Sequence, residues 1–245
     1  MSDQPESSPV AHSKARKAAA WGVHAYTAIG LPLAFIGAIA LARGDAKLFF
    51  LLDMAAVFVD ATDGTMARAV KVREVVPQFD GRRLDDIVDF LTFAFLPALA
   101  LPAFKMLPEG FEYFAIFPLL ASGYGFCQER AKTSESFVGF PSYWNIVLLY
   151  LYVLESAPWT NLGVSLALSV LVFVPIHYLY PTKTRLLKKT TIGLGSIWAL
   201  ALIAIGFNLE ASWVREAALV TLAYPLYYVV VSLVNHFRIT RTANN

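Results

Sequence analysis

Charged residues are scarce in this sequence: Asp, Glu, Lys and Arg make up 16% of its 245 residues, while hydrophobic residues make up 57%. A soluble domain of this size would need far more polar surface, so the composition indicates an integral membrane protein. Alternating polar and apolar segments are also lacking, which argues against a transmembrane β-barrel and favours an all-α bundle. The formal net charge is only +2, so the sequence does not predict a nucleic-acid partner.

Cysteine is almost absent, because Cys127 is the only one in the chain. An internal disulfide is therefore excluded, and we expect Cys127 to be a small buried apolar residue. Residues 1–13 have no apolar run and no Lys or Arg. This composition predicts a disordered cytoplasmic tail and argues against a cleaved signal peptide. We expect residues 14–245 to form a single transmembrane domain.

Long apolar runs fill most of the rest of the sequence. A helix needs about 20 apolar residues to cross the hydrocarbon core of a bilayer. Eight runs have spanning or near-spanning length, and the fifth is the shortest: 19–42, 47–69, 86–107, 110–128, 141–155, 159–179, 190–207 and 214–236. The sequence therefore predicts a bundle of about eight transmembrane helices joined by short connections.

Lys and Arg are distributed unevenly between those connections. If the N-terminus lies inside, 16 of the 20 basic residues fall in the inner segments and 4 fall in the outer turns. Cytoplasmic loops are enriched in Lys and Arg. This distribution predicts that both termini, and the loop between the second and third runs, face the cytoplasm.

Four aspartates stand out against the apolar background at the inner ends of the second and third runs. Asp60 and Asp63 are three residues apart, and Asp85 and Asp89 are four apart, so each pair lies on one face of a helix. Clustered carboxylates are unfavourable unless a cation joins them. All-carboxylate ligation favours Mg²⁺ or Mn²⁺ over Zn²⁺, and two such ions form a known arrangement for phosphoryl transfer.

The residues around these aspartates form a longer pattern, which reads Asp60-x-x-Asp63-Gly64-x-x-Ala67-Arg68 and then Gly81-x-x-x-Asp85-x-x-x-Asp89. It resembles the signature of the CDP-alcohol phosphotransferase family. The gap from Arg68 to Gly81 is longer than in most members. This gap, the eight runs and the segments "FCQERAKTSESFVGFPSYWN" and "HYLYPTKT" resemble the branch of the family that uses choline.

The resemblance implies an enzyme of the bacterial inner membrane that moves the phosphatidyl group of CDP-diacylglycerol to an alcohol and releases CMP. It implies that Asp60, Asp63 and Asp85 hold divalent ions, and that Asp89 completes the metal site and is the candidate general base. It also implies a homodimer. Four further residues of the pattern would face the CDP group: Gly64, Ala67, Arg68 and Gly81.

Aromatic residues near the inner ends of the fourth, fifth and sixth runs bear on the choice of alcohol. Choline has a quaternary ammonium without an N–H, and such groups are usually held by aromatic faces. Choline is the acceptor we expect, although serine, inositol and glycerol phosphate are alternatives that the signature does not exclude. An aromatic belt at the membrane interface would show the same residues. The candidate contacts are Glu129, Phe140, Tyr143, Trp144 and Tyr178.

Intramembrane acids also occur in transporters that carry cations or protons. A transporter would place its acids nearer the bilayer midplane and would not need the Gly and Arg spacing. Asp53 is such a deeper acid, and it lies outside the family pattern. We expect it to hydrogen-bond another span, through His24 or a tyrosine.

Overall fold

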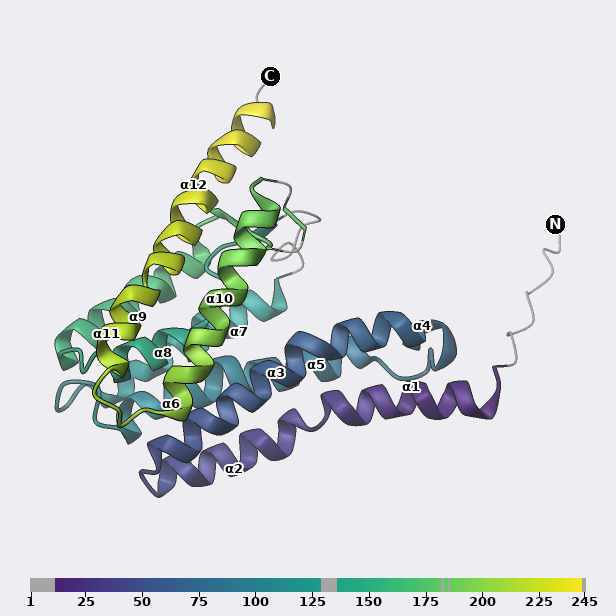
Figure 1. The fold of residues 1–245 in the computed structure, drawn as a ribbon, viewed down its shortest axis with the longest axis horizontal. Coiled ribbons are helices and arrows are strands. Elements are labelled where there is room, and N and C mark those ends of the chain that lie inside the picture. Colours follow the sequence, from purple (N-terminus) through teal and green to yellow (C-terminus); the bar gives the residue numbers. More distant parts are fainter. Residues whose placement is uncertain (1–11, 129–135, 182, 185, 244–245) are drawn as a thin grey trace.

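The computed structural model describes residues 12–128, 136–181, 183–184 and 186–243. Helices dominate this part of the chain, and the strands β1 (Ser136–Val138) and β2 (His177–Leu179) form a small antiparallel pair (Figure 1). The predicted all-α class is therefore confirmed in its coarse form. The predicted tail, 1–13, lies almost wholly outside the described residues.

The first apolar run forms two helices, α1 (Lys14–Thr27) and α2 (Gly30–Ala42). Ser13 caps the start of α1 by accepting a hydrogen bond from the Arg16 backbone N–H. The break after Thr27 is explained by Gly30, a poor helix former, and by Pro32, which has no N–H to continue the helical ladder. Both helices pack against α3 (Ala46–Val70).

The third apolar run is also interrupted. It begins with α5 (Gly81–Asp89), passes through a π-helical turn at Phe90–Phe95 (η1) and continues as α6 (Leu96–Ala103). Asp80 caps α5, and its Oδ1 accepts hydrogen bonds from the backbone N–H groups of Arg82 and Arg83. The short helix α4 (Val72–Val75) lies between α3 and α5 in the sequence. The wider π turn begins immediately after Asp89, at the end of the predicted site.

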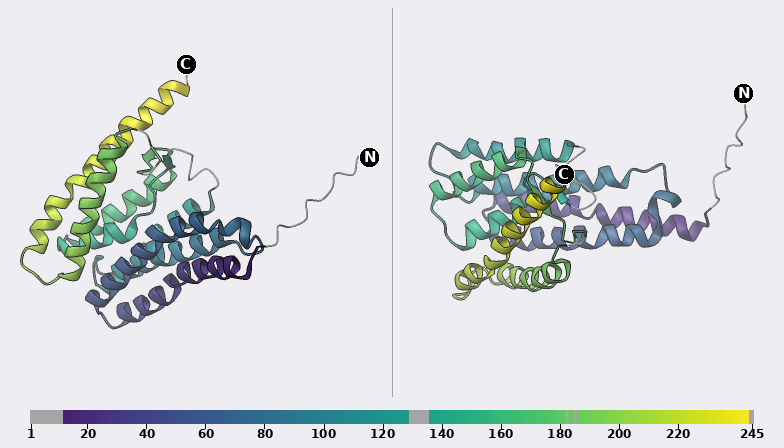
Figure 2. Two further views of the ribbon diagram at one scale, coloured as in Figure 1. Left: turned by 45° about the vertical axis from the view of Figure 1, so that its right-hand side comes forward. Right: turned by 90° about the horizontal axis from the view of Figure 1, so that it is seen from above.

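The second half of the chain contains a short, buried helix, α8 (Trp144–Val153), which packs against η1, α6 and α11. Its ten residues span about 15 Å, which is half the thickness of a hydrocarbon core. Figures 1 and 2 show α12 on one side of the molecule and α1 and α2 on the other, while α10 packs against α3. The remaining elements of this half are η2 (Glu112–Ala115), α7 (Ile116–Cys127), α9 (Pro158–Phe173), α10 (Lys188–Phe207), α11 (Val214–Thr221) and α12 (Ala223–Ala243).

Three helical segments among the described residues are long and apolar enough to cross a membrane: Lys14–Ala42, Lys188–Phe207 and Val214–Arg241. Much of their apolar surface is exposed, as at Ile197 and Leu200 of α10. This exposure fits contact with lipid and supports a membrane protein. Of the other expected spans, α8 and α9 are shorter, and α3 carries three aspartates. The count of eight spans stays a prediction.

Two expectations about single residues change in the structure. Cys127 is exposed, so the expectation of a buried residue was wrong; it is the last residue of α7, where packing against the bundle ends. Asp53 does hydrogen-bond another helix, but its partner is Asn145 of α8. His24 instead packs against Phe79 and Gly81.

Candidate active site

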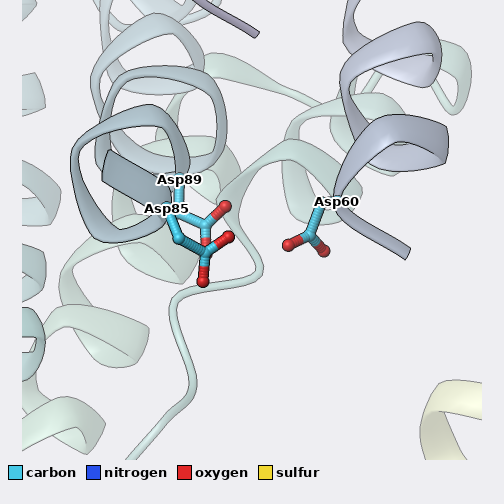
Figure 3. A group of neighbouring side chains, drawn as sticks. All are labelled: Asp60, Asp85 and Asp89. Atoms are coloured by element: carbon cyan, nitrogen blue, oxygen red, sulfur yellow. The ribbon is translucent and has the colours of Figure 1, made fainter. Parts of the chain in front are cut away.

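Three of the four predicted aspartates come together from two helices. Asp60 projects from α3, and Asp85 and Asp89 project from α5 toward it (Figure 3). One carboxylate oxygen from each residue lies within 4.8 Å of the others. This distance is short enough for one cation to contact all three carboxylates. The donor atoms also suit a hard divalent ion, since every one of them is a carboxylate oxygen.

Packing beside the aspartate face of α5 holds Asp85 and Asp89 toward α3. Val88 lies on the neighbouring face, directly before Asp89, and is buried, with its side chain against Gly30 of α2. A Cβ added at Gly30 would lie only 2.2 Å from Val88 Cγ1. The glycine therefore permits close packing of α2 on α5, and this packing sets the rotation of α5 about its axis.

Asp63 has a different environment from the other three aspartates. It is 6% exposed, and its Oδ2 accepts a hydrogen bond of 2.7 Å from the hydroxyl of Thr27 on α1. It is not part of the three-carboxylate group found among the described residues. It lies one turn from Asp60 on α3, so it borders the group without joining it in this structure.

Of the other residues in the family pattern, Gly64 and Arg68 adjoin open space, whereas Ala67 and Gly81 pack against other residues. A Cβ at Gly64 would have only Arg68 Nη1 nearby, at 3.3 Å, and Arg68 is exposed and donates to Thr65 Oγ1 at 2.9 Å. Ala67 packs partly against a small apolar cluster between α1 and α4. A Cβ at Gly81 would lie 2.5 Å from His24 Cε1, so close approach of a protein side chain already accounts for this glycine.

Three aromatic residues form a tyrosine cluster, made of Tyr143, Tyr178 and Tyr228. Tyr143 lies immediately before α8, and an electrostatic interaction links it to Asp60. Tyr178 of β2 stacks on Tyr228 of α12, with ring centroids 6.4 Å apart. Tyr228 donates its single hydroxyl proton to the Leu179 carbonyl at 2.8 Å. Tyr143 makes an edge contact with Tyr228, with ring centroids 6.4 Å apart.

The remaining candidates for choline binding are Phe140, Trp144 and Glu129. Phe140 makes edge contacts with Tyr143 and Trp144. Trp144 is 3% exposed, and its indole N–H donates to Ser122 Oγ at 2.7 Å, so it packs into the bundle interior. Glu129 lies outside the described residues. Tyr228 was not among the sequence candidates, although the run "AYPLYYVVV" (223–231) places three tyrosines on one helix.

Helices with exposed apolar surface define a membrane protein, and the carboxylates gathered from two helices could hold a metal ion. No family model matches the chain. Several relatives are named phosphatidylcholine synthase. The Pseudomonas aeruginosa protein is 39% identical over 187 residues, covering 76% of this chain and 79% of the relative. The Borreliella burgdorferi protein is 33% identical over 217 residues, covering 87% and 93%.

The third relative, from Rhizobium johnstonii, is 34% identical over 223 residues, covering 89% of this chain and 91% of the relative. Identity at this level over most of both chains establishes common ancestry. The chain belongs to the phosphatidylcholine synthases, a branch of the CDP-alcohol phosphotransferase family. The resemblance found in the aspartate pattern is thereby confirmed.

Proposed function

We propose that the protein transfers the phosphatidyl group of CDP-diacylglycerol to choline, giving phosphatidylcholine and CMP. The observation that carries this proposal is the convergence of Asp60, Asp85 and Asp89 within 4.8 Å, in a chain related to phosphatidylcholine synthases. The tyrosine cluster supports choline as the acceptor, because aromatic faces bind quaternary ammonium groups.

The carboxylates fit one or two Mg²⁺ or Mn²⁺ ions. Asp60, Asp85 and Asp89 would hold them, and Asp63 would join from one turn away on α3. When bound, the metal offsets the negative charge of the diphosphate and of the departing CMP. A cluster of three carboxylates without a cation would be unfavourable, because like charges repel.

The reaction forms one O–P bond and breaks another. The choline hydroxyl oxygen attacks the phosphorus that carries diacylglycerol, and the bond from that phosphorus to CMP breaks. Asp89 accepts the hydroxyl proton as general base, because a neutral hydroxyl is a weak nucleophile. Asp89 lies at the end of α5, on the face it shares with Asp85.

The CDP group would bind beside the residues of the family pattern. The open space at Gly64 lets a phosphate approach the α3 backbone, and the exposed Arg68 guanidinium can pair with phosphate oxygens. We also assign Ala67 and Gly81 to this surface, although both have packing partners in the protein.

Choline would bind between the metal centre and the tyrosine cluster. Tyr143, which interacts electrostatically with Asp60, and Tyr178 offer aromatic faces, and Tyr228 joins them through its ring contacts with both. Aromatic faces attract a quaternary ammonium without needing an N–H donor on the ligand. Phe140, Trp144 and Glu129 stay in the proposed acceptor region as further candidates.

We place the protein in the bacterial inner membrane as a bundle of eight spans with both termini in the cytoplasm. The Lys and Arg distribution supports this orientation. The acyl chains of the donor would stay in the bilayer while its cytidine reaches the cytoplasm. A homodimer follows from the family resemblance, and residues 14–245 would form one catalytic domain.

The test is a CMP-release assay on the full chain purified in detergent. CDP-diacylglycerol and Mn²⁺ or Mg²⁺ are supplied, and choline, serine, inositol and glycerol 3-phosphate are offered separately. We expect release with choline and none with the other acceptors, and we expect EDTA to abolish it until metal is restored. Release with a different acceptor and not with choline would contradict the choline assignment and keep the family chemistry.

A further inference from the structure

The last turn of α1 is joined to α3 by two adjacent hydrogen bonds. The Tyr26 hydroxyl lies 2.8 Å from Thr62 Oγ1, and the Thr27 hydroxyl lies 2.7 Å from Asp63 Oδ2. Two consecutive residues of α1 therefore contact two consecutive residues of α3. Thr27 and Asp63 are 7% and 6% exposed, so water has little access to the second bond.

The two hydrogen bonds differ in strength. Thr62 already donates its hydroxyl proton to the Phe58 carbonyl at 2.8 Å, so Tyr26 is the donor to Thr62 and both groups are neutral. An ionised carboxylate can only accept, so Thr27 donates to Asp63. Hydrogen bonds to an ionised group are shorter and about twice as strong as neutral ones. The Thr27 bond is the one that restrains a residue of the family pattern.

We propose that Thr27 is a positioning residue that orients the Asp63 carboxylate for a divalent cation. This inference rests on the proposed function, in which Asp63 is a metal ligand. By occupying Oδ2, Thr27 restricts rotation of the carboxylate and leaves Oδ1 as the oxygen for the metal. Partners of this kind orient metal-binding carboxylates and raise the affinity for the ion.

The break between α1 and α2 explains how Thr27 reaches Asp63. Thr27 is the last residue of α1, and α2 begins at Gly30, so the chain changes course immediately after the contact. Thr27 lies 36 residues before Asp63 and outside the family pattern. Only packing of α1 on α3 brings the two residues together.

The experiment measures Mn²⁺ binding to the full chain in detergent by electron paramagnetic resonance titration. Thr27→Val removes the hydroxyl and keeps the side-chain volume, whereas Thr27→Ser keeps the hydroxyl. Tyr26→Phe is the matched control, because it removes the neighbouring α1–α3 hydrogen bond without touching Asp63. We expect Thr27→Val to weaken Mn²⁺ binding by about 10- to 100-fold, and Thr27→Ser and Tyr26→Phe to bind as the parent does.

Three results would overturn the inference. One is unchanged Mn²⁺ affinity in Thr27→Val, even if the metal-free variant melts at a lower temperature, since that pattern belongs to a purely structural bond. Another is an equal loss of affinity in Tyr26→Phe. The third is a parent protein that binds no Mn²⁺, which would also contradict the proposed metal centre. If the parent binds Mn²⁺ but does not use choline as a substrate, only the assignment of choline as the acceptor is refuted. The Mn²⁺ affinities of the Thr27 variants would still decide the role of Thr27.

Discussion

At the scale of single residues, Asp89 is the side chain on which the proposed chemistry depends most. It is one of the three converging carboxylates, and it follows Asp85 by one helical turn. Asp89→Asn keeps the size of the side chain but removes its ability to take a proton. We expect CMP release to fall by about 10²- to 10⁴-fold, the range for general base catalysis.

Asp86→Asn is the control for this substitution. Asp86 is next to Asp85 on α5 but does not belong to the three-carboxylate group. We expect it to retain activity close to that of the parent. An Asp89→Asn variant that turns over at the parental rate would refute the general-base assignment.

The tyrosine cluster makes a second prediction at this scale. Tyr228→Leu removes an aromatic face and its stacking contact with Tyr178, while Tyr228→Phe removes only the hydroxyl. A cation–π contact of about 1–2 kcal/mol corresponds to about a 5- to 30-fold change in affinity. We expect Tyr228→Leu to raise the KM for choline by that factor and to leave the KM for CDP-diacylglycerol nearly unchanged.

Tyr228→Phe should keep most of the affinity for choline, because the ring face persists. Tyr113 is 89% exposed in η2, so Tyr113→Leu is a suitable control for the loss of a tyrosine. Equal increases in both KM values for Tyr228→Leu would remove Tyr228 from the acceptor pocket.

At the scale of elements, the packing of α2 on α5 controls the direction of Asp85 and Asp89. Gly30→Ala would place a methyl group against Val88, and valine has little χ1 freedom in a helix. Overpacking of this kind costs about 1–3 kcal/mol. We expect a lower melting temperature in detergent together with reduced CMP release, because α5 must shift.

Val88→Ala should restore part of both losses when combined with Gly30→Ala, since it removes the methyl groups that clash. Gly22→Ala on α1 is the matched control, because nothing lies within 4 Å of a Cβ added there. If Gly30→Ala were as stable and active as Gly22→Ala, this packing would not determine the orientation of α5.

At the scale of the whole molecule, the orientation in the membrane can be tested with the native cysteine. Cys127 is exposed at the end of α7, and the Lys and Arg distribution predicts that this end faces the cytoplasm. A membrane-impermeant maleimide should label Cys127 in inverted vesicles and not in right-side-out ones.

A cysteine on the opposite side provides the control. Glu109 is exposed in the turn before η2, which the same orientation places outside. Glu109→Cys in a Cys127→Ser background should be labelled only in right-side-out vesicles. Labelling of both positions from one side would contradict the predicted topology.

Much of the identification was available from spacing along the chain. Asp60 and Asp63, and Asp85 and Asp89, are close in sequence, so helix geometry alone predicts that each pair shares a face. Composition and long apolar runs predicted the helical membrane class, because a lipid environment leaves few other options. The comparisons confirm the family that the aspartate pattern predicted.

Other features depended on contacts between residues far apart in the chain. Thr27 and Asp63 are 36 residues apart, and Tyr178 and Tyr228 come from a strand and a distant helix. Hydropathy showed that the fifth run is the shortest, but not that α8 is buried or that Trp144 turns inward, because a buried helix and a lipid-facing helix are both apolar.

The sequence by itself determined the membrane class, the family and the aspartates that carry the proposed chemistry, since these follow from composition and helical periodicity. The tertiary structure decided which carboxylates meet, which tyrosines join them and which neighbour orients Asp63. Those features depend on how the helices rotate and pack against one another, and such packing is set by contacts such as Gly30 with Val88 that no local pattern predicts.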